Sequence, residues 1–368
     1  MMHTPSAIHL VDADKLRELA QLLLVAAGAT SDNAEQVATA LVSANLAGVD
    51  SHGVWYLPRY VSAIREGHLV PDAVPSVIEQ SGTTCLISGN WCFGQVAALF
   101  TLQRAIELAR VSSIAIAGLV QTHHLGRLGQ YSEIAAAQGM ISMIFASGYA
   151  EEIPVAVPYG GRKAVLHTNP LAIGIPINGQ DPLILDYATT ATTSFKVNQA
   201  SAEGEPLKPG MIVDKDGRPT INPSDYLEGG AHLPFGEHKG YALMVAIEVL
   251  GRVLTGAARF ADPQRGGSTF RHQGTSFVVV SANAFQPMAG FVSDALDLRH
   301  RIHNVPPAPG FSEVLLPGDI ESHHRAVRAR EGIPIANHVW VTIQQLAISL
   351  EVVHPLLSGY PTSLLNHL

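Results

Sequence analysis

One histidine stands in a sequence context that suits acid–base chemistry. His52 is flanked by Ser51 and Gly53 in the segment Asp-Ser-His-Gly-Val-Trp-Tyr, directly after a helix-like stretch. An imidazole titrates closer to neutrality than any other side chain, so it can pass protons during catalysis, and a neighbouring glycine allows the backbone to approach a ligand closely. A histidine that caps a helix or packs at the edge of a core is the commoner interpretation of such a tripeptide. His52 is therefore a candidate proton donor that needs support from the rest of the chain.

A second candidate segment is Gln-Thr-His-His-Leu-Gly-Arg-Leu-Gly at 121–129, between an apolar strand-like run and a helix predicted to begin near Tyr131. Glycines at such a junction allow close backbone approach, and the first free N–H groups of a helix favour a phosphate. Arg127 adds a charged donor. The Gly-x-Gly-x-x-Gly spacing occurs nowhere in the chain, which argues against an ordinary Rossmann site. A structural or capping role for His123 and His124 is an equally good interpretation.

Further polar segments stand at the ends of apolar runs. Asp186 follows the apolar residues 183–185, where its carboxylate could orient an imidazole or cap the next helix. Lys239 falls in the first turn of a predicted helix, where a cation opposes the helix dipole unless an anion occupies the same corner. Thr-Asn-Pro at 168–170 is a favourable tight-turn sequence. The segment 315–321, with two carboxylates, is by default a solvated turn.

Composition narrows the classes of partner. Of 368 residues, 47% are hydrophobic and 15% are charged, which is typical of a well-buried globular protein. The formal net charge is −8 without a long Lys/Arg cluster, so nucleic acid and anionic membranes are not expected partners. The N-terminus lacks a signal pattern and no apolar run is long enough to span a bilayer, so we expect a cytoplasmic protein. With only Cys85 and Cys92, and neither Cys-x-x-Cys nor His-x-x-x-His spacing, we expect no metal.

Periodicity predicts a mixed α and β chain with helical ends around a sheet-bearing middle. Two helices precede residue 50, with Asp12 or Asp14 and Thr30 or Ser31 as their caps. Strand-like runs cover 114–122, 140–147, 171–177, 183–189 and 276–281. Helical runs cover 57–66, 95–111, 238–257, 294–302, 321–331 and 340–350. The run 238–257 is apolar nearly all round and is expected to be buried, whereas the Pro/Gly-rich segment 203–230 is expected to be a long surface loop.

Taken together, the order and spacing of these motifs resemble the malate/L-lactate dehydrogenase family of non-Rossmann, NAD(P)-dependent oxidoreductases. The matching segments are Asp-Ser-His-Gly-Val (50–54), His-His-Leu-Gly-Arg (123–127), Thr-Asn-Pro (168–170), Leu-Asp-Tyr-Ala-Thr (185–189), Glu-His-Lys-Gly-Tyr-Ala-Leu (237–243) and Leu-Pro-Gly-Asp (316–319). The segments 67–72 and 93–98 and the pair His123-His124 are most similar to the hydroxycarboxylate dehydrogenase branch, which reduces 2-oxo acids including hydroxyphenylpyruvate.

The resemblance implies a two-lobed, mixed α/β (α+β) fold of the non-Rossmann malate/L-lactate dehydrogenase type. It assigns residues 1–75 and 236–368 to a discontinuous helical lobe and residues 76–235 to a sheet-containing lobe that binds the dinucleotide. It also implies a homodimer with the active site at the contact between subunits.

The reaction that the resemblance implies is reversible hydride transfer between NAD or NADP and C2 of a 2-hydroxy or 2-oxo acid. His52 would give a proton to the carbonyl oxygen, and Asp186 would orient His52 or raise its basicity. His124 is the second candidate for the proton donor, so the two histidines could exchange roles. Ser51, Tyr56 and Arg59 are the implied substrate residues. The implied cofactor-binding residues are Gly126, Arg127, Leu128, Thr168, Asn169, His238, Lys239, Gly318 and Asp319.

Three positions depart from the family pattern. Tyr56 stands where many relatives place an Arg that meets the substrate carboxylate, and Arg59 could substitute for it. His167 replaces a Gly before Thr-Asn-Pro, and Thr190 replaces a Ser. Because Trp55 and Tyr56 offer flat apolar surface, we expect a preference for aromatic 2-oxo acids over dicarboxylates, unless both rings pack into the helical lobe.

Other classes of function remain open on sequence grounds. A C=N (cyclic imine) reductase would use the same proton donor and hydride geometry. A catalytically silent binding protein would keep the fold, although every titratable position of the motifs is present. A metal-dependent hydrolase is the weakest alternative because ligand spacing is lacking.

Overall fold

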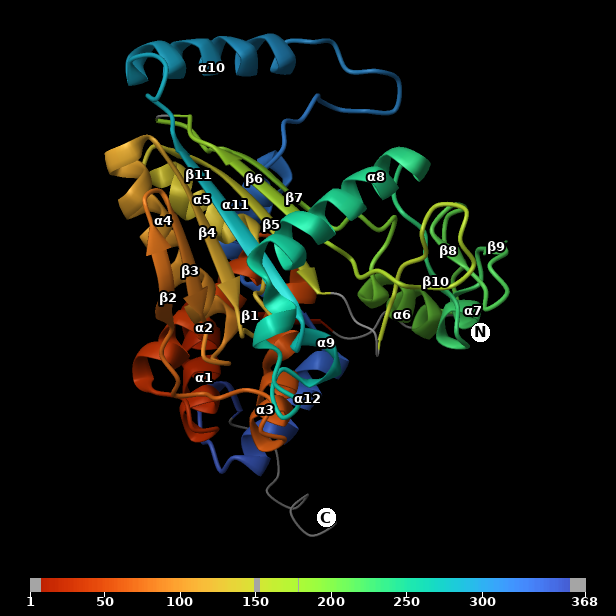
Figure 1. The fold of residues 1–368 in the computed structure, drawn as a ribbon. Helices are drawn as coiled ribbons and strands as arrows, with labels where there is room; N and C mark the ends of the chain where they lie inside the picture. The colour runs from red at the N-terminus through yellow and green to blue at the C-terminus, as the bar shows by residue number, and fades with distance from the viewer. Residues whose placement is uncertain (1–7, 149–152, 178, 358–368) are drawn as a thin grey trace. The chain divides into compact units, whose positions relative to one another are not determined.

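The computed structural model describes residues 8–148, 153–177 and 179–357, which form two compact units (Figure 1). The first unit contains residues up to Glu66 and from Glu321 onward, and the second contains Gly67–Ile320. The first unit is therefore discontinuous in sequence. Residues 236–320 lie in the second unit, where β11 (Gln273–Ser281) is one of the inner strands of the main sheet, and not with the chain ends.

The first unit is built from helices with buried apolar faces. Asp12 caps its first helix by accepting hydrogen bonds from two backbone amides, and Thr30 caps the second, which confirms both predicted helix starts. The strand β1 pairs antiparallel with β12, a pairing that periodicity did not predict. Its elements are β1 (Ile8–Val11), α1 (Ala13–Ala26), α2 (Ser31–Leu46), the short 3₁₀ turns η1 (Asp50–His52) and η2 (Val54–Tyr56), α3 (Leu57–Arg65), α11 (Asp319–Glu331), β12 (Ile333–Ala336), α12 (Asn337–Ser349) and the 3₁₀ turn η5 (Pro355–Leu357).

The second unit contains a seven-stranded sheet in the order β2-β3-β4-β11-β5-β6-β7. Only the β3–β4 pair is parallel among these neighbours. The strands are β2 (Ser76–Ser81), β3 (Thr84–Ser88), β4 (Ile114–Val120), β5 (Met140–Gly148), β6 (Leu171–Ile175), β7 (Leu183–Tyr187) and β11. Five of them match the predicted strand runs, and β2 and β3 were not predicted.

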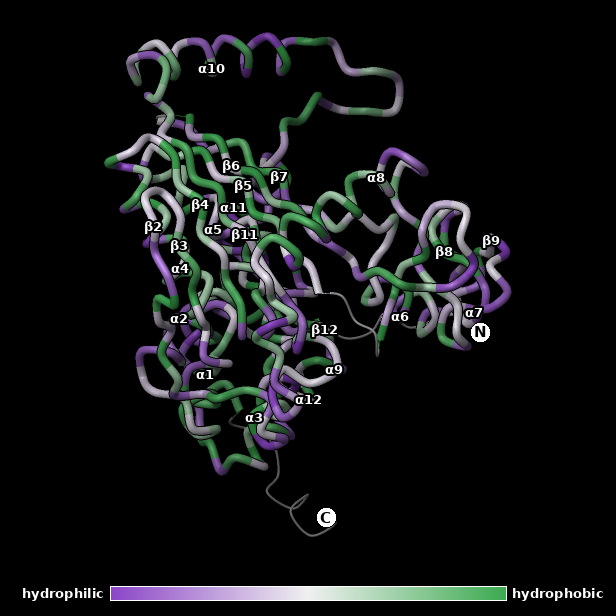
Figure 2. The backbone as a smooth tube through the Cα atoms, viewed as in Figure 1, coloured by the Kyte–Doolittle hydropathy of each residue, from purple (hydrophilic) through white to green (hydrophobic). Residues whose placement is uncertain are grey.

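Helices cover both faces of this sheet. On β5, Ser142 faces α5 (Gly129–Ala137) and bonds Ser132, while Ser147 faces the opposite helix and bonds Glu248, as the alternation of a strand requires. The helix α4 (Gly94–Ser112) packs on β4 and β11. The opposite face is covered by α8 (Glu237–Glu248), which continues into the π-helical η3 (Val249–Val253). The apolar residues of the inner strands and of α8 beyond its first turn are visible as green tube in Figure 2.

The segment 203–230, expected to be one long loop, contains regular structure. It carries β8 (Ile212–Val213), β9 (Pro219–Thr220) and α7 (Pro223–Leu227), next to α6 (Ser194–Glu203) and β10 (Ala231–His232). Strands of two residues carry almost no periodic signal, which is why they were missed. The remaining elements of this unit are η4 (Ala257–Phe260), α9 (Gly267–Phe270) and α10 (Met288–His303). Within the described part of the chain, no helix has the length and apolar character that a bilayer span requires.

Candidate active site

His52 ends the 3₁₀ turn η1 in the first unit, where polar contacts fix the backbone around it. Its Nδ1 lies 3.0 Å from the Ser51 hydroxyl, and its ring stacks on Tyr56 with centroids 6.5 Å apart. With Nδ1 engaged by Ser51, Nε2 is the nitrogen suited to exchange a proton with a substrate. The structure thus brings the predicted proton donor together with two of the predicted substrate residues.

Two residues that sequence reasoning missed hold this turn in place. Asn45 donates from Nδ2 to Asp50 at 2.6 Å and accepts the Val54 amide at 2.9 Å. Arg328, on α11, donates to both oxygens of Asp50 at 2.7 and 3.1 Å. A Cβ added to Gly53 would lie 2.2 Å from Asn45 Oδ1, so the glycine after His52 is required by close approach. The signal for Asn45 was its place on the apolar face of α2, where an amide must be paired.

Beside this turn, Arg59 lies over the aromatic pair Trp55 and Tyr56. Its guanidinium carbon is 3.6 Å from the Trp55 ring centroid and 5.2 Å from that of Tyr56. Burial raises the pKa of Tyr56 and Arg59 partly opposes that rise, so the phenol is a neutral O–H donor at physiological pH.

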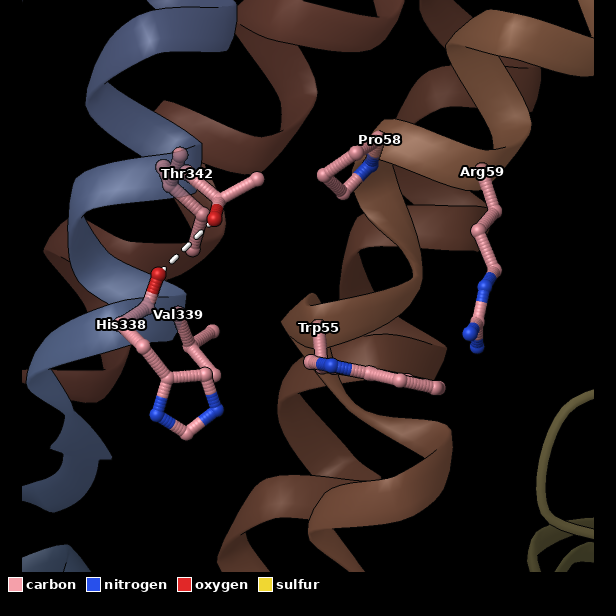
Figure 3. Close-up of a pocket in the computed structure, with 7 residues that line it drawn as sticks. Trp55, Pro58, Arg59, His338, Val339 and Thr342 are labelled. Carbon is pink, nitrogen blue, oxygen red and sulfur yellow. Dashed lines mark hydrogen bonds between the residues drawn. The ribbon is translucent and has the colours of Figure 1, made fainter. Parts of the chain in front are cut away.

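A pocket of about 190 Å³ opens between η2–α3 and α12 within the same unit (Figure 3). Figure 3 shows His338 and Val339 of α12 across the pocket from Trp55 and Pro58. Its lining residues are Trp55, Pro58, Arg59, His338, Val339, Thr342 and Ile343. Arg59 is the one side chain among them with a permanent charge.

In the second unit, the adjacent histidines have different environments. His123 is buried, with its ring centroid 4.4 Å from that of Phe270. Burial, aided by nearby His68, lowers its pKa to about 3, so His123 stays neutral and cannot supply a proton at neutral pH. His124 is only partly buried, and its ring centroid lies 5.9 Å from that of Phe270. Of the two histidines, His124 is the better proton-transfer candidate.

Asp186 and Arg127 are brought together at the start of α5. Asp186 Oδ2 accepts the Gly129 amide at 2.7 Å and lies 3.8 Å from Arg127 Nε. Arg127, with a side chain only 1% exposed, also donates to Glu133 at 2.8 Å. A Cβ on Gly129 would come within 2.7 Å of the guanidinium. Two partly buried carboxylates around the buried guanidinium therefore close the Gly-Arg-Leu-Gly turn, and the Asp186 carboxylate occupies the N-terminus of α5. Leu128 is buried in this turn, and Gly126 takes a φ of +73°.

The Thr168-Asn169 turn is fastened to neighbouring elements. Thr189 donates to the Thr168 carbonyl through its amide and hydroxyl. Asn169, fully buried, donates from Nδ2 to the Met244 carbonyl at 3.0 Å and to Glu248 at 3.1 Å. Burial also lowers the pKa of the preceding His167 to about 4. This turn thus joins the end of β7 to α8.

The start of α8 has the donors that an anionic cofactor needs. His238 and Lys239 are exposed in its first turn. The Phe235 amide bonds the Thr189 carbonyl at 3.0 Å, which places the loop before α8 against the loop after β7. Within the described residues, the buried hydroxyls of Thr190 and Thr192 have no hydrogen-bond partner. Helix N–H groups, a lysine and hydroxyls fit the phosphates of a dinucleotide.

Gly318 and Asp319 anchor a turn on the edge strand β7. Asp319 accepts the Leu316 amide at 2.7 Å and bonds His303 at 2.8 Å. Although partial burial raises the pKa of Asp319, these bonds and Arg299 hold it below its usual value. The Pro317 carbonyl accepts the Ile184 amide at 3.1 Å. These contacts hold the chain that follows α10 against β7. The predicted contact of Gly318 and Asp319 with the cofactor stays a prediction. Over the described ranges, no cluster of three His, Cys, Asp or Glu side chains could hold a metal ion.

Comparison with known proteins extends over most of the chain. The family model for malate/L-lactate dehydrogenase matches residues 11–344. The L-lactate dehydrogenase of Cupriavidus necator is 37% identical over 345 residues, which cover 92% of this chain and 97% of that protein. Hydroxycarboxylate dehydrogenase B of Escherichia coli strain K12 is 33% identical over 339 residues, covering 91% and 92%.

A solved relative has the same fold. The crystal structure of delta1-piperideine-2-carboxylate reductase from Pseudomonas syringae superposes with a TM-score of 0.81 and 31% identity, covering 92% of this chain and 100% of that one. The expected mixed α/β fold class and the resemblance to the family are thereby confirmed. This chain belongs to the malate/L-lactate dehydrogenase family of 2-hydroxyacid oxidoreductases.

Proposed function

We propose that the protein interconverts a 2-oxo acid and a 2-hydroxy acid with NAD or NADP, acting as a homodimer in the cytoplasm. The observation that carries this proposal is the fixed position of His52, whose turn is held by Asn45 and Arg328 while Ser51 engages its Nδ1. A preorganised imidazole is what general acid catalysis of carbonyl reduction requires. Two free, buried cysteines, Cys85 and Cys92, suit a reducing compartment.

When bound, the nicotinamide would supply or accept the hydride at C2 of the acid. His52 Nε2 would give a proton to the carbonyl oxygen during reduction and take it back during oxidation, with His124 as the alternative donor. Asp186 would orient the donor or raise its basicity. On the cofactor side, Thr168, His238 and Lys239 would hold the dinucleotide at the junction of the β7 loop and α8, while the buried Asn169 would hold the Thr168 turn against α8.

Arg59 would bind the substrate carboxylate in place of the arginine that Tyr56 replaces. Its guanidinium is already held over Trp55, so little side-chain entropy is lost on binding. The neutral Tyr56 hydroxyl would add a donor. The pocket between η2–α3 and α12 has one permanent cation, so a second carboxylate there would be desolvated without a partner. An aromatic side chain would instead bury apolar area against Trp55.

The test is a set of steady-state assays with phenylpyruvate, hydroxyphenylpyruvate, pyruvate and oxaloacetate, each with NADH and NADPH. We expect turnover of 2-oxo acids, with kcat/KM highest for an aromatic acid. Arg59→Met should raise KM for every oxo acid, while Arg65→Met, on the same helix, should not. A highest kcat/KM for oxaloacetate would contradict the aromatic preference, and an absence of turnover with any oxo acid would contradict the proposal.

Reduction of a cyclic imine is a second candidate function. The likeness to the Pseudomonas syringae reductase over nearly all of both chains favours it. A proton donor placed for a carbonyl oxygen is equally placed for an imine nitrogen. Turnover of a cyclic imine carboxylate with a kcat/KM above that of all four oxo acids would select this candidate.

A further inference from the structure

Glu248, the last residue of α8, carries a carboxylate that is buried beside the Thr168-Asn169 turn. The residue is 7% exposed. Its Oε1 accepts a hydrogen bond from Arg252 Nε at 2.6 Å, and its Oε2 accepts one from Asn169 Nδ2 at 3.1 Å. A buried carboxylate is costly to desolvate, and an apolar side chain of similar volume often stabilises a fold at least as well. Stability of the helix therefore does not by itself account for a carboxylate at this position.

The asparagine that Glu248 contacts has a backbone conformation that residues other than glycine rarely adopt. Asn169 has a φ of +37°, in the left-handed region, and is 0% exposed. Asparagine tolerates this region better than most residues, but the conformation is still strained. Among the described residues, its buried Oδ1 has no hydrogen-bond partner. Such unfavourable features persist only where the surroundings enforce them, and they gather at functional sites.

The surroundings that enforce this conformation come from α8 and from the loop after β7. Asn169 Nδ2 donates to the Met244 carbonyl at 3.0 Å as well as to Glu248. Because both partners are acceptors, the amide nitrogen and not the oxygen must face the helix. The Thr189 hydroxyl donates to the carbonyls of Thr168 and Asn169, each at 3.0 Å. Of the two acceptors on α8, the Glu248 carboxylate is charged and therefore makes the stronger hydrogen bond.

Thr168 is the residue of this turn that a ligand can reach. It is only partly buried, whereas Asn169 is inaccessible. The Thr168 hydroxyl lies 3.2 Å from His167 Nδ1. Because Thr168 and Asn169 share a peptide group, the contacts that hold the Asn169 side chain also limit where Thr168 can lie. The position of Thr168 thus depends on a carboxylate that lies 80 residues further along the chain, roughly counted, and that makes no contact with it.

We propose that Glu248 is a positioning residue for the dinucleotide, acting through Asn169 to hold Thr168 in place for the cofactor. The proposal rests on the proposed function, because it takes the Thr168 turn as part of the cofactor site. The carboxylate keeps Asn169 in its strained conformation before the cofactor arrives, so that binding does not have to order the turn. Removal of the carboxylate would let the turn relax, and the cofactor would then find a competent site in a smaller fraction of the molecules.

Three substitutions separate positioning of the turn from support of the helix. Glu248→Met removes both contacts of the carboxylate and largely keeps its volume. Arg252→Met removes the ion pair and keeps the contact with Asn169. Glu248→Gln keeps an oxygen acceptor for Asn169, and the Arg252 side chain, already 22% exposed, can turn toward solvent. Calorimetric titration with NADH and with NADPH gives the dissociation constants, and thermal melts show whether each variant is folded and how stable it is.

We expect binding and stability to rank the variants in opposite orders. Glu248→Met should raise the dissociation constant of the preferred cofactor roughly 10-fold, about the effect of losing one hydrogen bond to a charged group. Arg252→Met and Glu248→Gln should stay within about 3-fold of the wild type. Arg252→Met should nevertheless have a lower melting temperature than Glu248→Met, because it leaves a buried carboxylate without its cation. A role in stability alone would not produce this reversal.

A further variant keeps the test decisive if Glu248→Met fails to fold. Asn169→Gly removes the side chain that Glu248 holds and leaves the left-handed backbone accessible. It should weaken cofactor binding as much as Glu248→Met, and Glu248→Gln added to it should cause no further loss, because both changes act on the same contact. Asn169→Gly with wild-type affinity, a folded Glu248→Met with wild-type affinity, or Glu248→Gln as weak as Glu248→Met would overturn the proposal.

Failure of the proposed function would be recognised separately. A wild-type protein that binds neither NADH nor NADPH would contradict the proposed function, and the positioning role with it. A wild type that binds cofactor, with variants that depart from these expectations, would overturn the positioning role alone.

Discussion

Arg328 donates hydrogen bonds to both carboxylate oxygens of Asp50, at 2.7 and 3.1 Å, although the two residues are 278 positions apart in sequence. The same guanidinium donates to the Asn45 carbonyl. A bidentate pair of this kind fixes orientation as well as distance. The turn that ends at His52 is thus tied to α11, so both ends of the chain set the geometry of the candidate proton donor.

Breaking this pair should loosen the turn. We expect Arg328→Met to lower the free energy of unfolding by about 1–2 kcal/mol, because Asp50 is 38% exposed and solvent screens part of the interaction. Chemical denaturation measures the change, and kcat should fall more than KM rises. Arg330→Met is the matched control, since the Arg330–Glu331 pair is exposed on the same helix. Equal stability of the two variants would show that the pair does not support the turn.

Removing the His52 imidazole should remove proton transfer. His52→Gln is expected to lower kcat/KM by about 10²–10⁴-fold while the cofactor dissociation constant stays nearly unchanged. Steady-state assays and cofactor fluorescence give the two quantities. If the variant keeps more than about a tenth of wild-type kcat/KM, a loss below about 1.4 kcal/mol, His124→Gln should show the large loss instead and the donor role passes to His124.

Lys239 and Arg127 should respond differently to substitution. Lys239 is exposed at the start of α8, so Lys239→Ala should weaken dinucleotide binding about 10-fold with little loss of stability. Arg127 is buried between Asp186 and Glu133, and Arg127→Met leaves two carboxylates without their cation, so it should cost roughly 3 kcal/mol of stability. Calorimetric binding and denaturation separate the two effects. A change in oxo-acid KM alone for Lys239→Ala would place this lysine on the substrate side.

The buried His123 and His232 and the partly buried His167 should make the fold sensitive to mild acid. Burial lowers the pKa of His123 to about 3 and the pKa values of His167 and His232 to about 4, from the ordinary 6.5. Below pH 6.5 these histidines bind protons in the unfolded chain but not in the folded chain. Their contribution to the free energy of unfolding is therefore fully present above pH 6.5 and is lost as the pH drops toward 4. The slope is up to about 1.4 kcal/mol per pH unit for each histidine.

Denaturation midpoints at pH 7.5, 6.5, 5.5 and 4.5 would record this loss. His123→Leu should reduce the slope below pH 6.5 by up to about 1.4 kcal/mol per pH unit, whereas His300→Leu, at an exposed position of α10, should leave the slope unchanged. A wild-type profile that is flat down to pH 5 would mean that the buried histidines accept protons in the folded state.

The elements that the sequence predicted are those whose signals are local. The five strand runs and the caps at Asp12 and Thr30 depend on neighbouring residues, and the structure confirms them. The pairings of β1 with β12 and of Arg328 with Asp50 depend on residues at opposite ends of the chain, which no local pattern reveals. The predicted burial of the helical run 238–257 was wrong on one side, where Val245, Val249 and Leu250 are exposed. Apolar periodicity shows that a face is apolar but not whether another part of the chain covers it.

The place of β11 in the sheet also governs when the fold can form. Residues 273–281 lie between β4 and β5, which end at Val120 and Gly148. β4 can pair with β3 and β5 with β6 as soon as these are made, but the other edge of each strand stays unpaired until β11, which is made much later, arrives. During synthesis, most of the second unit must therefore leave the ribosome before its sheet can close. Pairing of such high sequence separation is slow and leaves strand edges open to aggregation. A chain that stops before residue 273 should accumulate as an aggregation-prone intermediate rather than as a smaller folded domain.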